Sequence, residues 1–279
     1  KLDIFDAEGH TKFYDSNFSS SNIKIVGVLA AGIDAHETMA ILASHIGLPG
    51  VDPKISSLVS NKDLFRKFMA ENNFEIPRFE VITIDNIDNL ETIASKIGFP
   101  LIIKNTSSSG SRGTKIFYSC NISEMRKIAL TAIEVSRSKK ALIESFWVGS
   151  EHTVETIFDF KGNFHRCFIT DREFDKSDGY ALETGLIHPS RLQKEVQDEM
   201  YILAENVSRT MKIDIGASKF DMILTETGPK IIEMTVRLSG GFDRQYLVPA
   251  ATGKNILGAA ILTSQGKEFS KNFLMDIKN

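Results

Sequence analysis

The sequence has little cysteine and no long apolar run. Only two cysteines occur among 279 residues, and the formal net charge of −3 is small. A transmembrane helix needs about 20 consecutive apolar residues, so we expect no membrane association. A chain that is not basic gives no electrostatic basis for nucleic-acid binding. Cys120 and Cys167 lack metal-ligand spacing, so we expect free buried thiols and a cytoplasmic location.

The composition is otherwise that of a globular protein, with 42% hydrophobic and 25% charged residues. The length suits one large or two moderate domains. The chain begins with Lys1, and its first residues lack a strand–helix unit of their own. We therefore expect the native protein to carry a further segment before Lys1.

A strand, a glycine and a helix follow one another near the N-terminus. The apolar run 23–30 predicts a buried strand of a parallel sheet, and Asp34 after Gly32 predicts the start of a helix. This pattern indicates a partial Rossmann-like domain over residues 1–59. No GxGxxG motif is present, which argues against a dinucleotide site.

A second helix is predicted to begin at Ser60, its N-cap residue. This places Lys62 in the first turn, where a cation opposes the helix dipole. Lys62 is therefore either simply exposed or directed at an anion.

Residues 78–145 alternate between strand and helix patterns, which predicts a compact α+β module. Within it lies the loop 105–114, NTSSSGSRGT, with Lys104 at the end of the strand before it. Glycine and small hydroxyl residues let backbone N–H groups approach an anion. The loop is either a phosphate-binding loop or a flexible linker.

Two glutamates border the aromatic connector that follows this module. Glu144 ends a strand, and Glu151 follows Trp147 in ALIESFWVGSE. Such carboxylates accept hydrogen bonds from an amino group or a ribose, or they are ordinary polar strand ends.

The segment 216–241 reads as two strands joined by a turn, FDMIL and KIIEMT. A hairpin symmetric about Thr227 places Asp221 opposite Glu233, with Thr235 and Arg237 on the same face. Ile232 is predicted on the other face. Two carboxylates this close need a cation between them. The cation is either a divalent metal or neighbouring basic side chains, which include Lys219 and Arg237.

In this order, the motifs resemble the ATP-grasp superfamily, in particular its carbamoyl-phosphate-synthase-like and carboxylate–amine ligase branch. The resemblance implies an ATP-grasp domain over residues 60–279, with α+β subdomains at 76–145 and 146–279 gripping ATP between them. One position departs from the family's ExNxR pattern, because Thr235 stands where the family usually carries asparagine.

The resemblance also implies roles for individual residues. Glu144, Trp147 and Glu151 would bind the adenine and ribose, and Arg237 with Lys104 would stabilise the transferring phosphoryl group. Asp221, Glu233 and Thr235 would bind Mg²⁺, with Mn²⁺ as an alternative. ATP phosphates would contact the lysines and the glycine-rich loop: Lys62, Lys104, Ser109, Gly110, Ser111 and Gly113.

The activity implied is that of an ADP-forming ligase. A carboxylate becomes an acyl phosphate, and an amine then displaces phosphate to form a C–N bond. The acceptor pocket is expected near Arg172, Glu183, His188 and Arg244, for small polar substrates, and a homodimer is left open. Two alternatives remain, a carboxylase-type enzyme that activates bicarbonate and a non-catalytic ATP-binding module.

Overall fold

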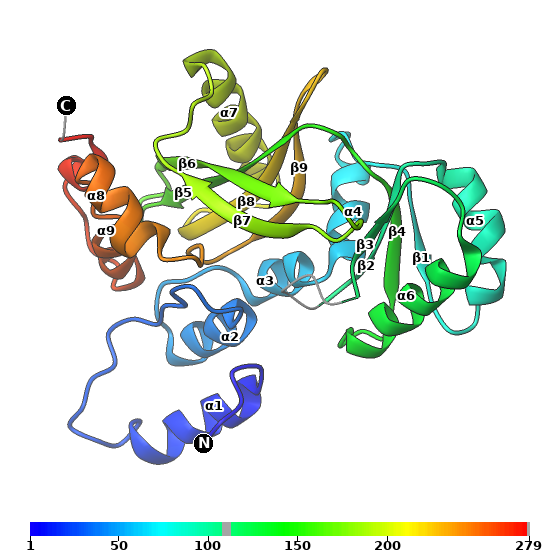
Figure 1. The fold of residues 1–279 in the computed structure, drawn as a ribbon. Helices are drawn as coiled ribbons and strands as arrows, with labels where there is room; N and C mark the ends of the chain where they lie inside the picture. Colours follow the sequence, from blue (N-terminus) through cyan, green and yellow to red (C-terminus); the bar gives the residue numbers. More distant parts are fainter. Residues whose placement is uncertain (108–112, 278–279) are drawn as a thin grey trace.

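Two antiparallel sheets form the body of the molecule, and helices pack against each of them (Figure 1). The computed structural model describes residues 1–107 and 113–277. The mixed α/β architecture predicted from the sequence is confirmed. Among the described residues, no helix is both long enough and apolar enough to cross a membrane.

The smaller sheet has four strands in the order β1-β4-β2-β3. Helices α5 and α6 cover one of its faces and share a core with it, as the alternating pattern of residues 78–145 predicted. The elements are β1 (Phe79–Ile82), η1 (Ile87–Asn89), α5 (Leu90–Ile97), β2 (Leu101–Asn105), β3 (Lys115–Phe117), α6 (Ile122–Val135) and β4 (Ala141–Ser145).

The larger sheet has five strands in the order β7-β6-β5-β8-β9. Helices α3, α4 and α7 pack on one face, where Phe65, Met200 and Phe220 belong to one buried cluster. The elements are α3 (Pro53–Ser60), α4 (Lys62–Glu71), β5 (Ser150–Phe158), β6 (Phe164–Asp175), β7 (Leu182–Ile187), α7 (Lys194–Thr210), β8 (Gly216–Thr225) and β9 (Gly228–Thr235).

The C-terminal part adds a second, smaller core beside this sheet. There Val248, Ile256 and Ala259 are fully buried with Phe168. The elements are a π-helical turn η2 (Asp243–Leu247), α8 (Val248–Thr252), α9 (Ile256–Ser264) and η3 (Lys271–Leu274).

The N-terminal prediction is wrong in part. Helices α1 (Ala7–Asn17) and α2 (His36–Ile46) form, but residues 23–30 make no strand. Only an isolated bridge joins Ala31 to Leu238. A strand needs a hydrogen-bonding neighbour, and the described part of residues 1–61 supplies none. The Rossmann-like part of the expected fold is therefore not confirmed.

Two predicted helix starts also differ. Helix α4 begins at Lys62 with Asn61 as its N-cap, because Ser60 is the last residue of α3. The side chain of Asp34 does not cap α2, whose N-cap is Ala35. The Ser60 hydroxyl instead forms a hydrogen bond with His36, and Asp34 pairs with Arg237.

Candidate functional site

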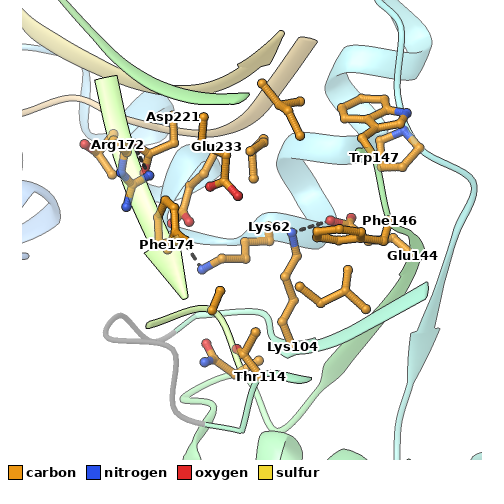
Figure 2. Close-up of a pocket in the computed structure, with 18 of the residues that line it drawn as sticks. Lys62, Lys104, Thr114, Glu144, Phe146, Trp147, Arg172, Phe174, Asp221 and Glu233 are labelled. Atoms are coloured by element: carbon orange, nitrogen blue, oxygen red, sulfur yellow. Dashed lines mark hydrogen bonds and ion pairs between the residues drawn. The ribbon is translucent and has the colours of Figure 1, made fainter. Parts of the chain in front are cut away.

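A cavity of about 370 Å³ lies between the two sheets, and side chains of both sheets and of α4 line it (Figure 2). Its lining holds charged side chains on several elements: Lys62 and Arg66 of α4, Lys104 of β2, Glu144 of β4, Asp221 of β8 and Glu233 of β9. These elements lie far apart in the sequence. The fold therefore gathers them at one place.

Most of the sequence-predicted site residues line this cavity. They are Lys62, Lys104, Glu144, Trp147, Glu151, Asp221, Glu233, Thr235 and Arg237. Ser109, Gly110 and Ser111 lie outside the described residues. Gly113 is described, with a φ of +65°, and a Cβ there would lie 2.8 Å from the Ala132 Cα of helix α6. Its position thus requires glycine for backbone conformation and close packing.

Glu144 is the centre of a buried charge cluster. Its carboxylate accepts hydrogen bonds from the Lys104 ammonium and, at 3.1 Å, from Nε of Arg66. Burial would raise the pKa of Glu144, but the charges of Arg66 and Lys104 outweigh burial and lower it to about 2. Arg66 also donates to the Ile232 carbonyl at 2.6 Å, which ties α4 to β9. Glu144 thereby fixes the position of Lys104, and its predicted contact with adenine stays a prediction.

One end of the cavity is largely apolar and aromatic. Phe146 and Trp147 lie together there (Figure 2), and Ile102 and Phe174 also line the cavity. Lys176 lies over the rings of Phe146 and Phe174, 5.4 and 5.3 Å from their centroids, and pairs with Glu151 at 2.5 Å. Flat apolar surfaces of this kind suit a planar heteroaromatic ring.

The opposite wall carries the two carboxylates of the β8–β9 hairpin. Asp221 is directly opposite Glu233 in the strand ladder, as the sequence predicted. Asp221 pairs with Lys219 at 2.7 Å and with Arg172 at 3.0 Å, and Glu233 pairs with Lys62 at 3.1 Å. Burial would raise the pKa of Asp221, but the charges of Lys219 and Arg172 lower it to about 2. Both acids therefore lie among cations.

The hairpin reaches this register by a route that the sequence argument missed. The tight turn pairs Thr225 with Gly228, and the register then shifts by one residue beyond Met222, which is opposite Ile231. The extra residue is Ile232, and it lines the cavity together with Glu233. The prediction that Ile232 points to the other face is therefore wrong. A β-bulge turns its side chain, because bulges break the alternation of faces.

Arg237 continues the same wall. It donates to Asp34 through Nε at 3.1 Å and also through a terminal nitrogen. The sequence assigned Asp34 to a helix cap, whereas the structure uses it to hold the N-terminal segment against the site. Arg237 does not neutralise Asp221 or Glu233 directly. The alternative that basic side chains neutralise the two acids is therefore wrong for Arg237. It is correct for Lys219, which pairs with Asp221.

Most of this chain matches a known protein family. Residues 61–272 match the family model "Carbamoyl-phosphate synthase L chain, ATP binding domain". The chain belongs to this family. The predicted ATP-grasp membership and its carbamoyl-phosphate-synthase-like character are thus confirmed.

Individual relatives are distant and longer. The chain is 25% identical over 246 residues to the uncharacterized protein y4rH of Sinorhizobium fredii, covering 88% of this chain and 50% of that protein. It is 26% identical to the carbamoyl phosphate synthase large chain of Campylobacter jejuni, covering 82% and 20%. It thus spans half or less of either relative.

A solved structure gives the same fold. An L-amino acid ligase from Bacillus licheniformis superposes with a TM-score of 0.75 at 20% identity, over 96% of this chain and 62% of that one. At this identity the likeness shows the ATP-grasp fold.

The donor atoms of the hairpin suit a hard divalent cation. Asp221 and Glu233 offer carboxylate oxygens, and the buried Thr235 hydroxyl has no hydrogen-bond partner among the described residues. Within residues 1–107 and 113–277, no three His, Cys, Asp or Glu side chains form a metal-binding group. The protein would thus supply only part of an octahedral shell. Phosphate and water oxygens complete such shells around Mg²⁺.

Sequence reasoning did not assign Arg66, Arg172 and Phe174 to the ATP site. Arg66 lies four residues after Lys62 on one helix, so helical spacing could have placed it on the same face. Arg172 and Phe174 reach the cavity because β6 continues to Asp175. No local signal marked them.

Proposed function

We propose that this ATP-grasp protein is an ADP-forming carboxylate–amine ligase. The observation that carries the proposal is the opposition of Asp221 and Glu233, with Lys62 and Lys104 at the same cavity. Two carboxylates can hold Mg²⁺ on ATP, while lysines stabilise the charge of a transferring phosphoryl group. This pairing of hard oxygen donors with cations suits phosphate transfer.

In the proposed orientation, adenine occupies the apolar end beside Phe146 and Trp147. The phosphates extend towards Lys62, Lys104 and Glu233. A substrate carboxylate oxygen attacks the γ-phosphorus, the bond to the β,γ-bridging oxygen breaks, and ADP leaves. An amine nitrogen then attacks the acyl carbon, phosphate departs, and the amine loses one proton. The exclusion of water from the cavity would protect the acyl phosphate.

One observation favours a second candidate, a non-catalytic ATP-binding module. Thr235 replaces the family's asparagine beside Glu233, and a threonine hydroxyl has a shorter reach than an amide oxygen. A module of this kind would bind Mg²⁺ and ATP without turnover. A carboxylase-type enzyme would use the same ATP residues, and no feature of this cavity favours it.

The decisive experiment is a screen of ADP release with Mg²⁺–ATP against pairs of small carboxylates and amines, with bicarbonate as one carboxylate. ADP release that needs both a carboxylate and an amine supports the ligase. Release with bicarbonate alone indicates the carboxylase type, and tight ATP binding without any turnover indicates the module. The Glu233→Gln variant is the control for contaminating ATPase activity.

A further inference from the structure

A second cavity of about 230 Å³ adjoins the proposed ATP pocket. Four residues line both cavities: Asp34, Lys62, Glu233 and Thr235. The two cavities therefore meet at the pair formed by Lys62 and Glu233, where the proposed phosphates end. A molecule in the second cavity would lie next to the reacting phosphoryl group.

The protonation of His36 in this cavity follows from its hydrogen bonds. The Ser60 hydroxyl donates its only hydrogen to the Ser56 carbonyl at 2.8 Å. It must therefore accept from Nε2 of His36, also at 2.8 Å. Burial and the charge of Arg237 lower the pKa of His36 to about 4, so the ring is neutral at pH 7. Its Nδ1 is then a bare acceptor.

No described residue donates a hydrogen bond to this Nδ1, although His36 is only 5% exposed. A buried acceptor without a donor is costly, commonly by about 1–3 kcal/mol. A ligand that brings an N–H or O–H group would satisfy it. A carboxylate would present a second acceptor and would not.

Arg137 lies at the rim of the cavity and favours an anionic group, whereas His36 favours a hydrogen-bond donor. Its guanidinium lies over the ring of Phe5, 4.4 Å from the centroid. No carboxylate of residues 1–107 or 113–277 forms an ion pair with it. Its charge is close enough to contribute to the lowered pKa of His36. An anionic group of a ligand would find a cation here.

The remaining wall is partly apolar, with Phe5, Val59 and Val135 among its lining residues. It can cover a compact hydrocarbon group. The volume lies below the range of about 300–1,000 Å³ that is typical of sites for drug-sized ligands. The cavity thus selects a small molecule with an N–H donor, an anionic group and a short apolar part.

We propose that this cavity binds the amine substrate, and that this amine carries a carboxylate, as an amino acid does. The proposal rests on the proposed ligase function. The amine donates to Nδ1 of His36, the carboxylate pairs with Arg137, and the apolar part lies against Phe5 and Val59. This location differs from the acceptor pocket that the sequence suggested near His188 and Arg244, neither of which lines it.

Measurements of ligand binding test the proposal and do not require turnover of ATP. The full chain is saturated with Mg²⁺ and a non-hydrolysable ATP analogue, and the twenty common L-amino acids are titrated by calorimetry. The tightest binder is then compared with two matched probes, its decarboxylated amine and its deaminated acid. We expect the amino acid to bind at least tenfold more tightly than either probe.

Two variants assign the contacts. Arg137→Ala should reduce the affinity for the amino acid about tenfold or more and leave the decarboxylated amine unchanged. His36→Phe should weaken both amine-containing ligands but not the deaminated acid, with circular dichroism to verify its fold. Arg126→Ala is the matched control, because Arg126 lies on helix α6, which ends shortly before Arg137, and pairs with Asp88 on the surface.

Three results would overturn the proposal: no saturable binding by any amino acid, equal binding to Arg137→Ala and wild type, or a deaminated acid that binds as tightly as the amino acid. Failure of the ligase function looks different. In that case the analogue and the amino acid bind with the expected variant effects, but ATP yields no ADP.

Discussion

Asp221 lies directly opposite Glu233 because β9 contains one residue more than β8 between the turn and this pair. Without the bulge at Ile232, the turn that joins Thr225 to Gly228 would place Asp221 opposite Ile232. The two carboxylates would then lie on opposite faces of the sheet. The bulge therefore creates the carboxylate pair, and Ile232 lines the same cavity as Glu233.

Glu233→Gln should abolish most Mg²⁺-dependent ADP formation. The substitution keeps the size of the side chain and its contact with Lys62 but removes the negative charge that would hold the metal. We expect a fall of about 100-fold or more, the size seen when one electrostatic contact to a transition state is lost. Coupled-enzyme detection of ADP over a Mg²⁺ series measures it.

Glu226→Gln is the control for this variant, because Glu226 lies in the turn of the same hairpin, between β8 and β9. It should behave as wild type. Full activity of Glu233→Gln would contradict the metal assignment.

Thr235→Val should separate stability from metal binding. The Thr235 hydroxyl is buried and has no hydrogen-bond partner among the described residues, so its replacement by a methyl group relieves an unsatisfied group. We expect an unchanged or higher midpoint of thermal unfolding. We also expect a severalfold higher Mg²⁺ concentration for half-maximal activity, because one oxygen ligand is lost. An unchanged Mg²⁺ requirement would exclude Thr235 from the metal shell.

Thr235→Asn tests the same position in the opposite direction. The variant restores the asparagine that the ATP-grasp family usually carries, with an amide oxygen of longer reach. We expect a lower Mg²⁺ requirement than that of wild type, measured in the same assay. A rise in the Mg²⁺ requirement would show that the local backbone is adjusted to threonine.

Sequence patterns predicted those site residues that lie in regular secondary structure and at spacings that resemble the ATP-grasp family. Lys104 at the end of β2 and the Asp221–Glu233 pair are of this kind. Patterns failed where long-range contacts decide the structure. The apolar residues 23–30 have no strand neighbour, and Asp34 pairs with Arg237, which is 203 residues away. The partners of Glu144 come from α4 and β2, which no local pattern relates to β4.

Glu144→Gln should destabilise the protein strongly. The substitution leaves Lys104 and Arg66 buried without their counter-charge, and breaking a buried ion pair commonly costs about 3–5 kcal/mol. Urea denaturation at pH 7 gives the free energy of unfolding. Asp88→Asn breaks the exposed pair with Arg126 and should cost less than about 1 kcal/mol. Equal losses in the two variants would contradict the buried cluster.

Glu155 should make the stability of the protein fall as the pH rises from about 5 to 8. Its carboxyl group is fully buried and accepts only the Ser239 backbone N–H, at 2.6 Å, among the described groups. Burial raises the pKa of Glu155 to about 7, from 4.5. Between these values the folded state holds a proton that the unfolded state has released, so stability is greatest at low pH and declines through pH 7.

Glu155→Gln removes this titration while its amide oxygen can still accept from Ser239. The lowered pKa of His36, about 4, gives a slope of the opposite sign, so the informative quantity is the difference between variant and wild type. Between pH 5 and pH 8, the free energy of unfolding of the variant should rise on the order of 3 kcal/mol relative to that of wild type. Urea denaturation at both pH values measures the gain. A flat difference for Glu155→Gln would mean that Glu155 is already ionised at pH 5 in the folded protein.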